Sequence, residues 1–369
     1  MGEAQSVEGH RSAREREGWV TGRLVLFCLA STVITVVAGL VQVSFGEYSM
    51  TFLEAWQAVF NPGVIFNLHA WSAFLLGTDL PEMSTASIVV WTLRMPRVFV
   101  AVIAGATLAI SGAIFQAVTR NELASPFVLG VSSGAGFAVL ATLVVFSGLS
   151  PFLPLIAALG GTVAFVIVYT IAWKGGTSPV RLVLAGVVVN MVFQSLQQGL
   201  FFFADDLGVV QTAIAWLTGS LTGTGWGEVR IAILPAAVAI VIALAGARQL
   251  NVLMLGESTA RSLGMRVERV RFSLSAVAIL AASAAIAVAG IVSFFGLVVP
   301  HIVRNTIGGD NRQLMIGCLF AGPALMVVAD VGARLALGGT QMPVGVVTGL
   351  IGGPYFLYLM RKQQSMGEL

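Results

Sequence analysis

The sequence is short of charged residues. Asp, Glu, Lys and Arg make up only 10% of its 369 residues, and hydrophobic residues make up 57%. A soluble domain carries about 25% charged residues, so this composition excludes an ordinary soluble protein and indicates a chain that lies mostly in a lipid bilayer. The formal net charge of +3 is too small to indicate a nucleic-acid partner.

Residues that hold metals or bind nucleotides are also scarce. The two cysteines, Cys28 and Cys318, lie inside apolar runs, and the three histidines are far apart in the sequence, so no metal-ligand spacing is present. The sequence contains neither a GxxxxGK[ST] phosphate-binding loop nor an HExxH motif. We therefore expect no cofactor on this chain, no ATP binding by such a loop and no integral-membrane enzyme.

Long apolar runs are what the sequence has instead. The stretch from Arg94 to Gly136 shows the pattern: about twenty nearly uncharged residues, a polar break at 120–122, and a second apolar run. Hydropathy predicts an all-α integral membrane protein with about ten transmembrane helices. The eighth is short and interrupted by proline, which indicates a kinked or re-entrant piece. The predicted spans are 22–44, 97–118, 127–146, 152–172, 182–203, 228–247, 272–291, 293–306, 312–333 and 343–361.

The positions of Lys and Arg predict the orientation. With a cytoplasmic N-terminus and ten spans, sixteen of the twenty Lys and Arg residues lie on the cytoplasmic side, as the positive-inside rule expects. We therefore predict an N-in, C-in topology with a disordered cytoplasmic tail at 1–20, a membrane domain at 21–362 and a cytoplasmic tail at 363–369. The four residues on the outer side are Arg94, Arg97, Arg230 and Arg334.

Two segments between spans are long. Residues 46–93 form an outer connection rich in aromatic residues, which predicts short interfacial helices and an aromatic belt that anchors the chain. Residues 250–271 form the longest cytoplasmic loop. Its apolar positions and the turn at Gly264 predict a short helix-turn-helix, which suits docking to a cytosolic partner.

Polar side chains inside spans are candidates for function. Asp330 lies four residues before Arg334 on the same helical face, which favours an internal pair over a proton-coupling role. Amides are dense in the fifth span, and Gln116 lies in the second. Such amides either line a transport pathway or join helices by hydrogen bonds, and the sequence leaves both open. The fifth-span amides of the predicted pathway are Asn190, Gln194 and Gln198.

A series of motifs follows along the chain. They are RMPR (94–97), SGAIFQ (111–116), LASPFVLGVSSGAG (123–136), LAGVVVN (184–190), WLTGS (216–220), LGESTARSLG (255–264), FFGLVVPHIVR (294–304), ADVGAR (329–334) and MPVGVVTGLIGGPYFLYLM (342–360). In this order they resemble the permease subunits of ABC importers for iron-siderophores, haem and vitamin B12, the FecCD-type (type II) importers. The resemblance covers nearly all of the chain after residue 90.

The resemblance implies a dimer of ten-span permease subunits, identical or paralogous, with the translocation path between them. Two ABC ATPase subunits, which carry ATP and Mg, would each receive one cytoplasmic coupling loop. The matching loop residues here are Leu255, Gly256, Glu257, Ala260, Arg261 and Gly264.

A periplasmic or lipid-anchored substrate-binding protein is the third partner that the resemblance implies. It would dock on Arg94, Arg97 and Arg334, whose guanidinium groups suit carboxylate partners. The alternative is that these arginines reach lipid phosphates or pair with Asp330 or other acids nearby.

The resemblance also implies a cytoplasmic gate after the second span. The vitamin B12 permease has an Asn-Pro-Leu turn there, whereas this sequence has Asn121-Glu122-Leu123. Losing the proline removes a fixed backbone angle and places a carboxylate near the exit. Asn121 and Leu123 stay candidate gate residues.

The predicted function is the membrane-spanning permease of an ATP-driven ABC importer for a ferric siderophore or related iron chelate, in a bacterial cytoplasmic (inner) membrane. ATP hydrolysis is expected on a separate subunit. The alternatives are a haem or vitamin B12 importer of the same family or, from a different class, an ion-coupled secondary transporter. Asp330 is the only acidic residue deep in a predicted span, which leaves little for ion coupling.

Overall fold

The computed structural model describes residues 19–46, 48–174, 176–204, 206–336 and 341–367. Within these ranges the chain is helical, apart from one isolated bridge between Trp173 and Thr177. The elements run in the order α2 (Gly22–Ser44), α3 (Phe52–Val59), α4 (Pro62–Ile65), α5 (Leu68–Leu76), α6 (Thr85–Val89), a π-helical turn (Val90–Arg94), α7 (Met95–Thr119), α8 (Val131–Val145), a 3-10 helix (Ser147–Phe152), α9 (Leu153–Ala172), α10 (Pro179–Phe201), α11 (Leu207–Thr218), α12 (Trp226–Met254), α13 (Glu257–Ser262), α14 (Val267–Ala289), α15 (Phe295–Ile307), α16 (Asn311–Leu335) and α17 (Val344–Gly367).

The predicted tails are described only in part. Residues 1–18 of the N-terminal tail lie outside the described ranges. At the other end α17 extends to Gly367 and takes in most of the predicted 363–369 tail.

Each of the ten predicted spans falls on a helix. Seven helical stretches are long and apolar enough to cross a membrane, and an eighth candidate is the pair Phe52–Ile65 and Leu68–Leu76, bent by 103°. Helices α8 and α15 and the apolar part of α17 are shorter than a full span. The described chain is therefore an all-helical membrane protein with seven or eight candidate spans. The seven are Gly22–Ser44, Thr85–Thr119, Ser147–Ala172, Pro179–Phe201, Trp226–Met254, Val267–Ala289 and Asn311–Leu335.

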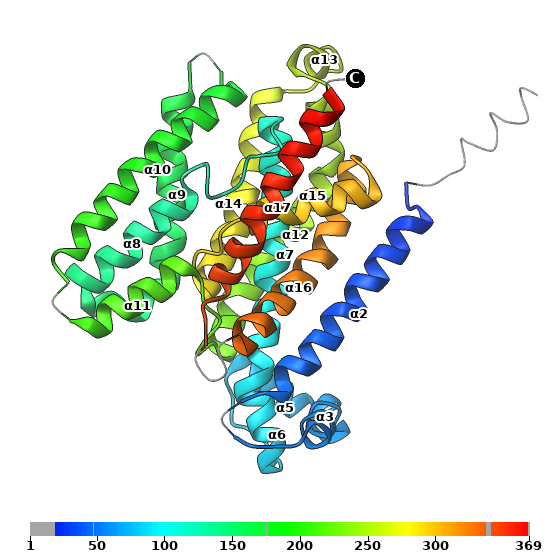
Figure 1. Ribbon diagram of the computed structural model, residues 1–369, viewed down its shortest axis with the longest axis vertical. Helices are drawn as coiled ribbons and strands as arrows, with labels where there is room; N and C mark the ends of the chain where they lie inside the picture. Colours follow the sequence, from blue (N-terminus) through cyan, green and yellow to red (C-terminus); the bar gives the residue numbers. More distant parts are fainter. Residues whose placement is uncertain (1–18, 47, 175, 205, 337–340, 368–369) are drawn as a thin grey trace, which may run out of the picture.

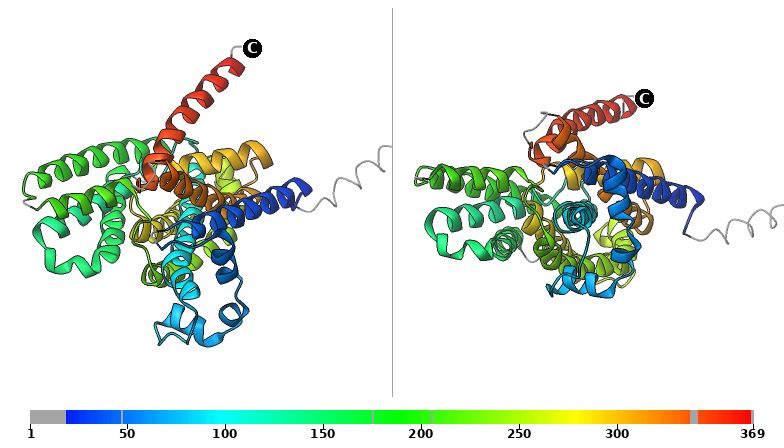
Figure 2. Two further views of the ribbon diagram at one scale, coloured as in Figure 1. Left: turned by 60° about the horizontal axis from the view of Figure 1, so that its bottom comes forward. Right: turned by 90° about the horizontal axis from the view of Figure 1, so that it is seen from below.

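Helix α7 is the centre of the bundle. It continues from α6 through the π-helical turn, which ends at Arg94, two residues before Pro96. Because Pro96 has no backbone N–H to donate one turn back, the helix widens here instead of keeping its regular hydrogen bonds. Most of α7 is buried against α12, α14 and α16, and it lies in the middle of the molecule (Figure 1, Figure 2).

Two glycine pairs let α7 approach its neighbours closely. A Cβ on Gly112 would lie 1.8 Å from the carbonyl oxygen of Gly296 in α15, and one on Gly105 would lie 2.5 Å from the carbonyl oxygen of Gly322 in α16. A real Cβ atom does not come this close to a backbone atom. Only glycine therefore fits at these two crossings, as is common where membrane helices pack through small residues.

Helices α8, α9, α10 and α11 form a group to one side of α7 (Figure 1). They pack on one another, and the group meets the centre chiefly where α9 packs on α14. Only 22% of the apolar window of α10 is buried, so one face of α10 has few contacts from this chain. Helix α11 has no counterpart among the predicted spans, because its twelve residues are too few for a span-length apolar run.

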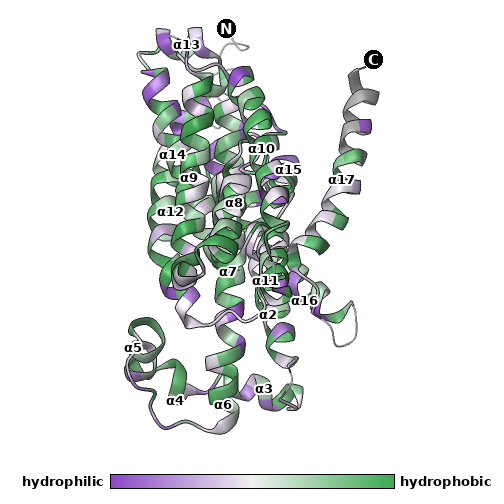
Figure 3. Ribbon diagram, turned by 90° about the vertical axis from the view of Figure 1, so that its left-hand side faces the viewer, coloured by the Kyte–Doolittle hydropathy of each residue, from purple (hydrophilic) through white to green (hydrophobic). Residues whose placement is uncertain are grey.

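The two ends of the bundle carry different elements. Helices α3 to α6 lie beyond one end, and α13 and the C-terminal end of α17 lie at the other (Figure 1). Figure 3 shows hydrophilic residues at both ends and a mostly hydrophobic middle. This arrangement agrees with an outer connection at 46–93 and a cytoplasmic loop at 250–271, and the orientation in the membrane stays a prediction.

The outer connection contains a packed aromatic cluster. Phe74 stacks on Trp91 and Trp226, with ring centroids 5.6 Å and 4.8 Å away, and Trp226 Nε1 donates to the Trp91 carbonyl oxygen at 2.6 Å. Trp71 packs edge-on against these three rings. The prediction of an anchoring belt is therefore wrong for Trp71, Phe74 and Trp91, which instead pack with Trp226 and fix α5 against α12, whereas Phe66 is exposed.

Candidate functional site

At the α3–α6 end, a buried ion pair joins α7 to α16. Arg97 Nε and Nη2 donate to the two carboxylate oxygens of Asp330 at 2.8 Å and 2.7 Å. Arg97 also donates to Gln341 Oε1 at 2.8 Å, and Gln42 of α2 donates to Asp330. The predicted pair of Asp330 with Arg334 is therefore wrong. The bidentate geometry that a guanidinium prefers is supplied by a different helix, 233 residues away in the sequence.

Arg94 and Arg334 lie at the same end and bind backbone carbonyl oxygens. Each donates to two carbonyl oxygens of the segment 42–48, Arg94 at 2.7 Å and 2.5 Å and Arg334 at 3.0 Å and 2.7 Å. Arg94 is 7% exposed and Arg97 5%, whereas Arg334 is half-buried. The structure thus brings the three predicted docking residues together and leaves Arg334 the most accessible of them.

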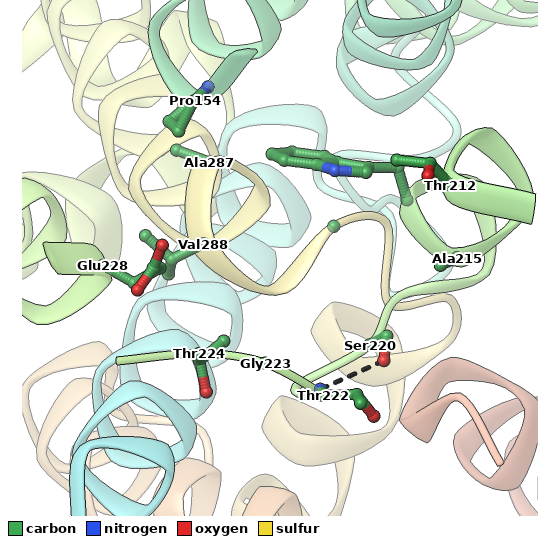
Figure 4. Close-up of a pocket in the computed structure, with 12 residues that line it drawn as sticks. Pro154, Thr212, Ala215, Ser220, Thr222, Gly223, Thr224, Glu228, Ala287 and Val288 are labelled. Atoms are coloured by element: carbon green, nitrogen blue, oxygen red, sulfur yellow. Dashed lines mark hydrogen bonds between the residues drawn. The ribbon is translucent and has the colours of Figure 1, made fainter. Parts of the chain in front are cut away.

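A pocket of about 340 Å³ opens near this end, between α9, α11, α12 and α14 (Figure 4). The turn that follows the WLTGS motif supplies part of its wall, and Ser220 Oγ accepts the Thr222 N–H at 3.1 Å. Thr222 Oγ1 donates in turn to Gln341 Oε1 at 3.0 Å, which links the pocket rim to Arg97. Its polar lining side chains are Thr212, Ser220, Thr222, Thr224 and Glu228.

A second cavity, of about 290 Å³, lies between α8 and α10. Gln194 and Gln198 lie in its wall, and the buried Gln197 donates to the Ser133 carbonyl oxygen at 2.8 Å. Asn190 is outside the wall and accepts from Gln194 at 3.4 Å. The amides of α10 therefore do both things that the sequence left open, since some line a cavity and others bond within the protein. The wall consists of Phe127, Ser132, Ser133, Gln194, Gln197, Gln198, Phe201, Leu217 and Ile291.

At the opposite end, the predicted helix-turn-helix is present. Helix α13 follows Gly256, and Gly264 makes the turn into α14 with a φ of +81°, a left-handed conformation that favours glycine. Ala260 faces inward and is fully buried. The side chains of Leu255, just before α13, and Arg261, on α13, are exposed, so this loop presents an apolar and a basic group to the surroundings.

A buried polar cluster holds α13 in place. Arg271 of α14 is fully buried and donates to Glu257 at 2.6 Å and to Glu268 at 3.2 Å. Both Arg271 and Glu268 also bind Thr177, in the loop between α9 and α10. Helix α13, the start of α14 and that loop are therefore fixed to one another.

The turn after α7 carries the predicted gate residues. Asn121 Oδ1 accepts the Leu123 N–H at 2.9 Å, so the asparagine side chain closes the turn in which the vitamin B12 permease has a proline. Glu122 faces α15, where Arg304 Nη1 and His301 Nδ1 lie 3.3 Å and 3.6 Å from its carboxylate oxygens.

Gln116 belongs to this turn and not to the amide cavity. Its Nε2 donates to the Leu297 carbonyl oxygen at 3.4 Å, and its Oε1 accepts from Arg304 Nη2 at 3.0 Å. It therefore ties α7 to α15 next to the predicted gate.

Several residues of these sites could not be singled out from the sequence. Each makes its contact with a residue distant in sequence, and the signal that was available was a lone polar group at the edge of an apolar run. These residues are Gln42, Arg271, Arg304 and Gln341. Within the described ranges, no three His, Cys, Asp or Glu side chains lie close enough to hold a metal ion.

Comparison with known proteins gives a consistent result. The FecCD transport family matches residues 34–362. The Fe(3+)-citrate import system permease protein of Bacillus subtilis (strain 168) is 34% identical over 359 residues, which cover 97% of this chain and 99% of that protein. The cobalamin import system permease protein of Halobacterium salinarum is 35% identical over 369 residues, which cover 93% and 98%. A solved structure of an inward-facing metal-chelate type ABC transporter superposes with a TM-score of 0.76 at 25% identity, covering 91% of this chain and 98% of that one.

Proposed function

Since this chain belongs to the FecCD transport family and is the multi-pass permease subunit of a bacterial ABC importer, we propose that its cargo is a ferric siderophore or a related iron chelate. The observation that carries this proposal is the cavity beside α10, whose polar lining side chains are neutral amides and hydroxyls. Such groups can bind the outer oxygen atoms of a chelate, whereas they are poor competitors for the metal inside it. The similarity to an Fe(3+)-citrate permease supports the same cargo class.

Cobalamin is the second candidate, because a cobalamin permease is as similar to this chain as the ferric-citrate one. The ion-coupled secondary transporter is wrong as a class, given the family. Asp330, the carboxylate that such coupling needs, is already held by Arg97. The chain is not itself an enzyme, and ATP is hydrolysed on a partner ATPase.

The proposal includes an assembly. Two permease subunits of ten spans each, N-in and C-in, would enclose the path between them and receive two ATPase subunits on their coupling loops. The exposed face of α10 supports this arrangement, because Gln194 and Gln198 are exposed in the single chain beside large apolar side chains such as Met191 and Leu196. Amides on a helix surface that faces lipid are costly, so a second subunit that covers them stabilises the helix.

The cargo is tested by uptake into proteoliposomes that hold this chain with its own ATPase and binding protein. Radiolabelled ferric citrate, a ferric hydroxamate, haem and cobalamin are compared with and without ATP. We expect uptake of one iron chelate that requires both ATP and the binding protein. ATP-dependent uptake of cobalamin alone would replace iron chelate by cobalamin as the cargo.

We propose that the binding protein docks at the α3–α6 end, on the surface held by Arg94, Arg97 and Arg334. All three arginines are engaged within the chain, but Arg94 and Arg97 are buried and Arg334 is only half-buried. Arg334 is therefore the one that we expect to reach a carboxylate of the partner. Replacing Arg334 with glutamine is expected to weaken binding-protein affinity by about tenfold, measured on the permease complex in nanodiscs.

Arg230→Gln is the matched control for docking. Arg230 lies at the same end and, like Arg334, donates to two backbone carbonyl oxygens, those of Phe74 and Ala73 at 2.7 Å and 2.9 Å. The control loses the same kinds of bonds, and its affinity should stay unchanged. If the Arg334→Gln and Arg230→Gln variants had the same affinity for the binding protein, Arg334 would only support the fold.

We propose that α13 is the coupling helix that enters the ATPase. Arg261 is exposed on it, and its charge is only loosely held by Glu257 at 3.7 Å. Arg261→Glu is expected to lower ATP-driven uptake about tenfold by reversing the charge that α13 presents to the ATPase, while the stability of the isolated permease stays the same. Arg23→Glu, an exposed change at the start of α2, is the control. Undiminished uptake by the Arg261 variant would argue against this contact.

A further inference from the structure

The turn at 120–123 connects two parts of the cytoplasmic end. On one side Glu122 faces Arg304 and His301 of α15, as described above. On the other side Arg120 reaches the start of the coupling helix, because a Cβ on Gly256 would lie 3.6 Å from Arg120 Nη1. Arg120 itself has a φ of +49°, which is rare for a residue with a side chain. The turn therefore has a defined conformation and contacts on both sides.

The partner of Glu122 on α15 is largely withdrawn from water. The Arg304 side chain is 17% exposed and Glu122 43%. Arg304 Nη2 is bound by Gln116, whereas Nη1 is buried and makes no hydrogen bond among the described residues. Glu122 is the only acidic side chain of the described ranges within 4.0 Å of this guanidinium. An arginine in such a position depends on its counter-charge more than a surface arginine does.

The position of this ion pair determines what it restrains. Leu123 follows Glu122 and is 45% exposed, and its N–H is bound by Asn121. The 3.3 Å contact of Glu122 with α15 therefore fixes the whole turn, including the direction in which Leu123 projects. A proline at this position would fix only the backbone angle. The carboxylate instead fixes the turn to a neighbouring helix through an ion pair, and that ion pair can be broken.

We propose that Glu122 is a positioning residue of the cytoplasmic exit, which holds the turn and Leu123 against α15 through its ion pair with Arg304. The pair keeps the exit closed at rest, and the coupling helix displaces the turn through Arg120 when the ATPase moves α13. This inference rests on the proposed function of α13 as the coupling helix. An ordinary surface ion pair would contribute almost nothing, so the two interpretations differ in a measurable way.

The experiment measures how accessible Leu123 is. Leu123→Cys is introduced into a chain whose Cys28 and Cys318 are replaced by serine, and the assembled complex in proteoliposomes is labelled with a water-soluble maleimide without nucleotide. Glu122→Gln and Arg304→Gln are each expected to raise the labelling rate about five- to tenfold. The swapped pair Glu122→Arg with Arg304→Glu should return it to within about twofold of the parent. Arg23→Gln is the control and should leave the rate unchanged.

Either of two results would overturn the inference: unchanged labelling in both single variants, or a swapped pair that labels as fast as they do. Glutamine is nearly isosteric with glutamate, and the Glu122 side chain is half-exposed, so we expect the Glu122→Gln variant to assemble. If Arg304→Gln does not assemble, the labelling rate of Glu122→Gln alone decides whether the inference holds. The labelling does not require any cargo. A complex that takes up none of the tested chelates would contradict the proposed cargo. The labelling rates would still test the role of Glu122, because they do not depend on the cargo.

Discussion

Replacing Asp330 with alanine is expected to destabilise the protein by about 3–5 kcal/mol, because it leaves the buried guanidinium of Arg97 without its counter-charge. The side chains of Arg97 and Asp330 are 7% and 1% exposed, and they hold α7 to α16 with two hydrogen bonds of normal length. Gln42 of α2 also loses its acceptor. The free energy of unfolding can be followed by SDS titration of the detergent-solubilised permease.

A double variant separates charge from packing. Arg97→Met with Asp330→Leu removes both charges and keeps the volume of the side chains. We expect this double variant to recover at least about half of the stability that Asp330→Ala loses. Glu82→Ala, an exposed acidic residue at the same end, should change stability by less than about 0.5 kcal/mol. Equal destabilisation of the single and double variants would contradict the expectation that the loss comes from an uncompensated buried charge.

Replacing Gly112 with alanine is expected to cost more than about 3 kcal/mol, at the upper end for overpacked sites. The new Cβ would lie 1.8 Å from a backbone oxygen of Gly296, and backbone on α15 cannot turn aside as a long side chain can. The centre of the bundle would have to open. We expect little or no folded permease after membrane extraction, measured by size-exclusion chromatography.

Gly199→Ala in α10 is the matched control, because no heavy atom lies within 4 Å of a Cβ placed there. Alanine is favoured over glycine inside a helix by about 1 kcal/mol, so this variant should be as stable as the parent or more stable. A Gly112 variant as stable as the Gly199 variant would show that α7 and α15 can separate without loss.

Sequence alone predicted the elements far better than their contacts. The first predicted span, 22–44, coincides with α2, and the short helix predicted within 250–271 is present as α13, because apolar length and loop charge are local properties. The π-helical turn before Pro96 and the twelve-residue α11 were not predicted, because neither changes the average hydropathy over a span-length window.

The pairing of charges could not be predicted in the same way. Asp330 and Arg334 are one helical turn apart, which made their pairing reasonable, yet Arg97 approaches from another helix with better geometry. Glu122 and Arg304 are likewise brought together by the packing of α7 on α15. The partner of a charged side chain depends on the distances between helices. These distances are known only once the whole fold is known, so a single sequence does not give them directly.

The central place of α7 has a consequence for how the chain is made. Its glycines are synthesised early, but Gly296, which covers Gly112, leaves the ribosome about 180 residues later, or roughly ten to forty seconds at ordinary elongation rates. During that interval the helix is in the membrane with its closest-packing face uncovered. The glycine-containing face of α7, which packs most closely in the finished bundle, is therefore the one most accessible to wrong partners while translation continues. Another helix that packed on this face too early would exclude α15 and α16.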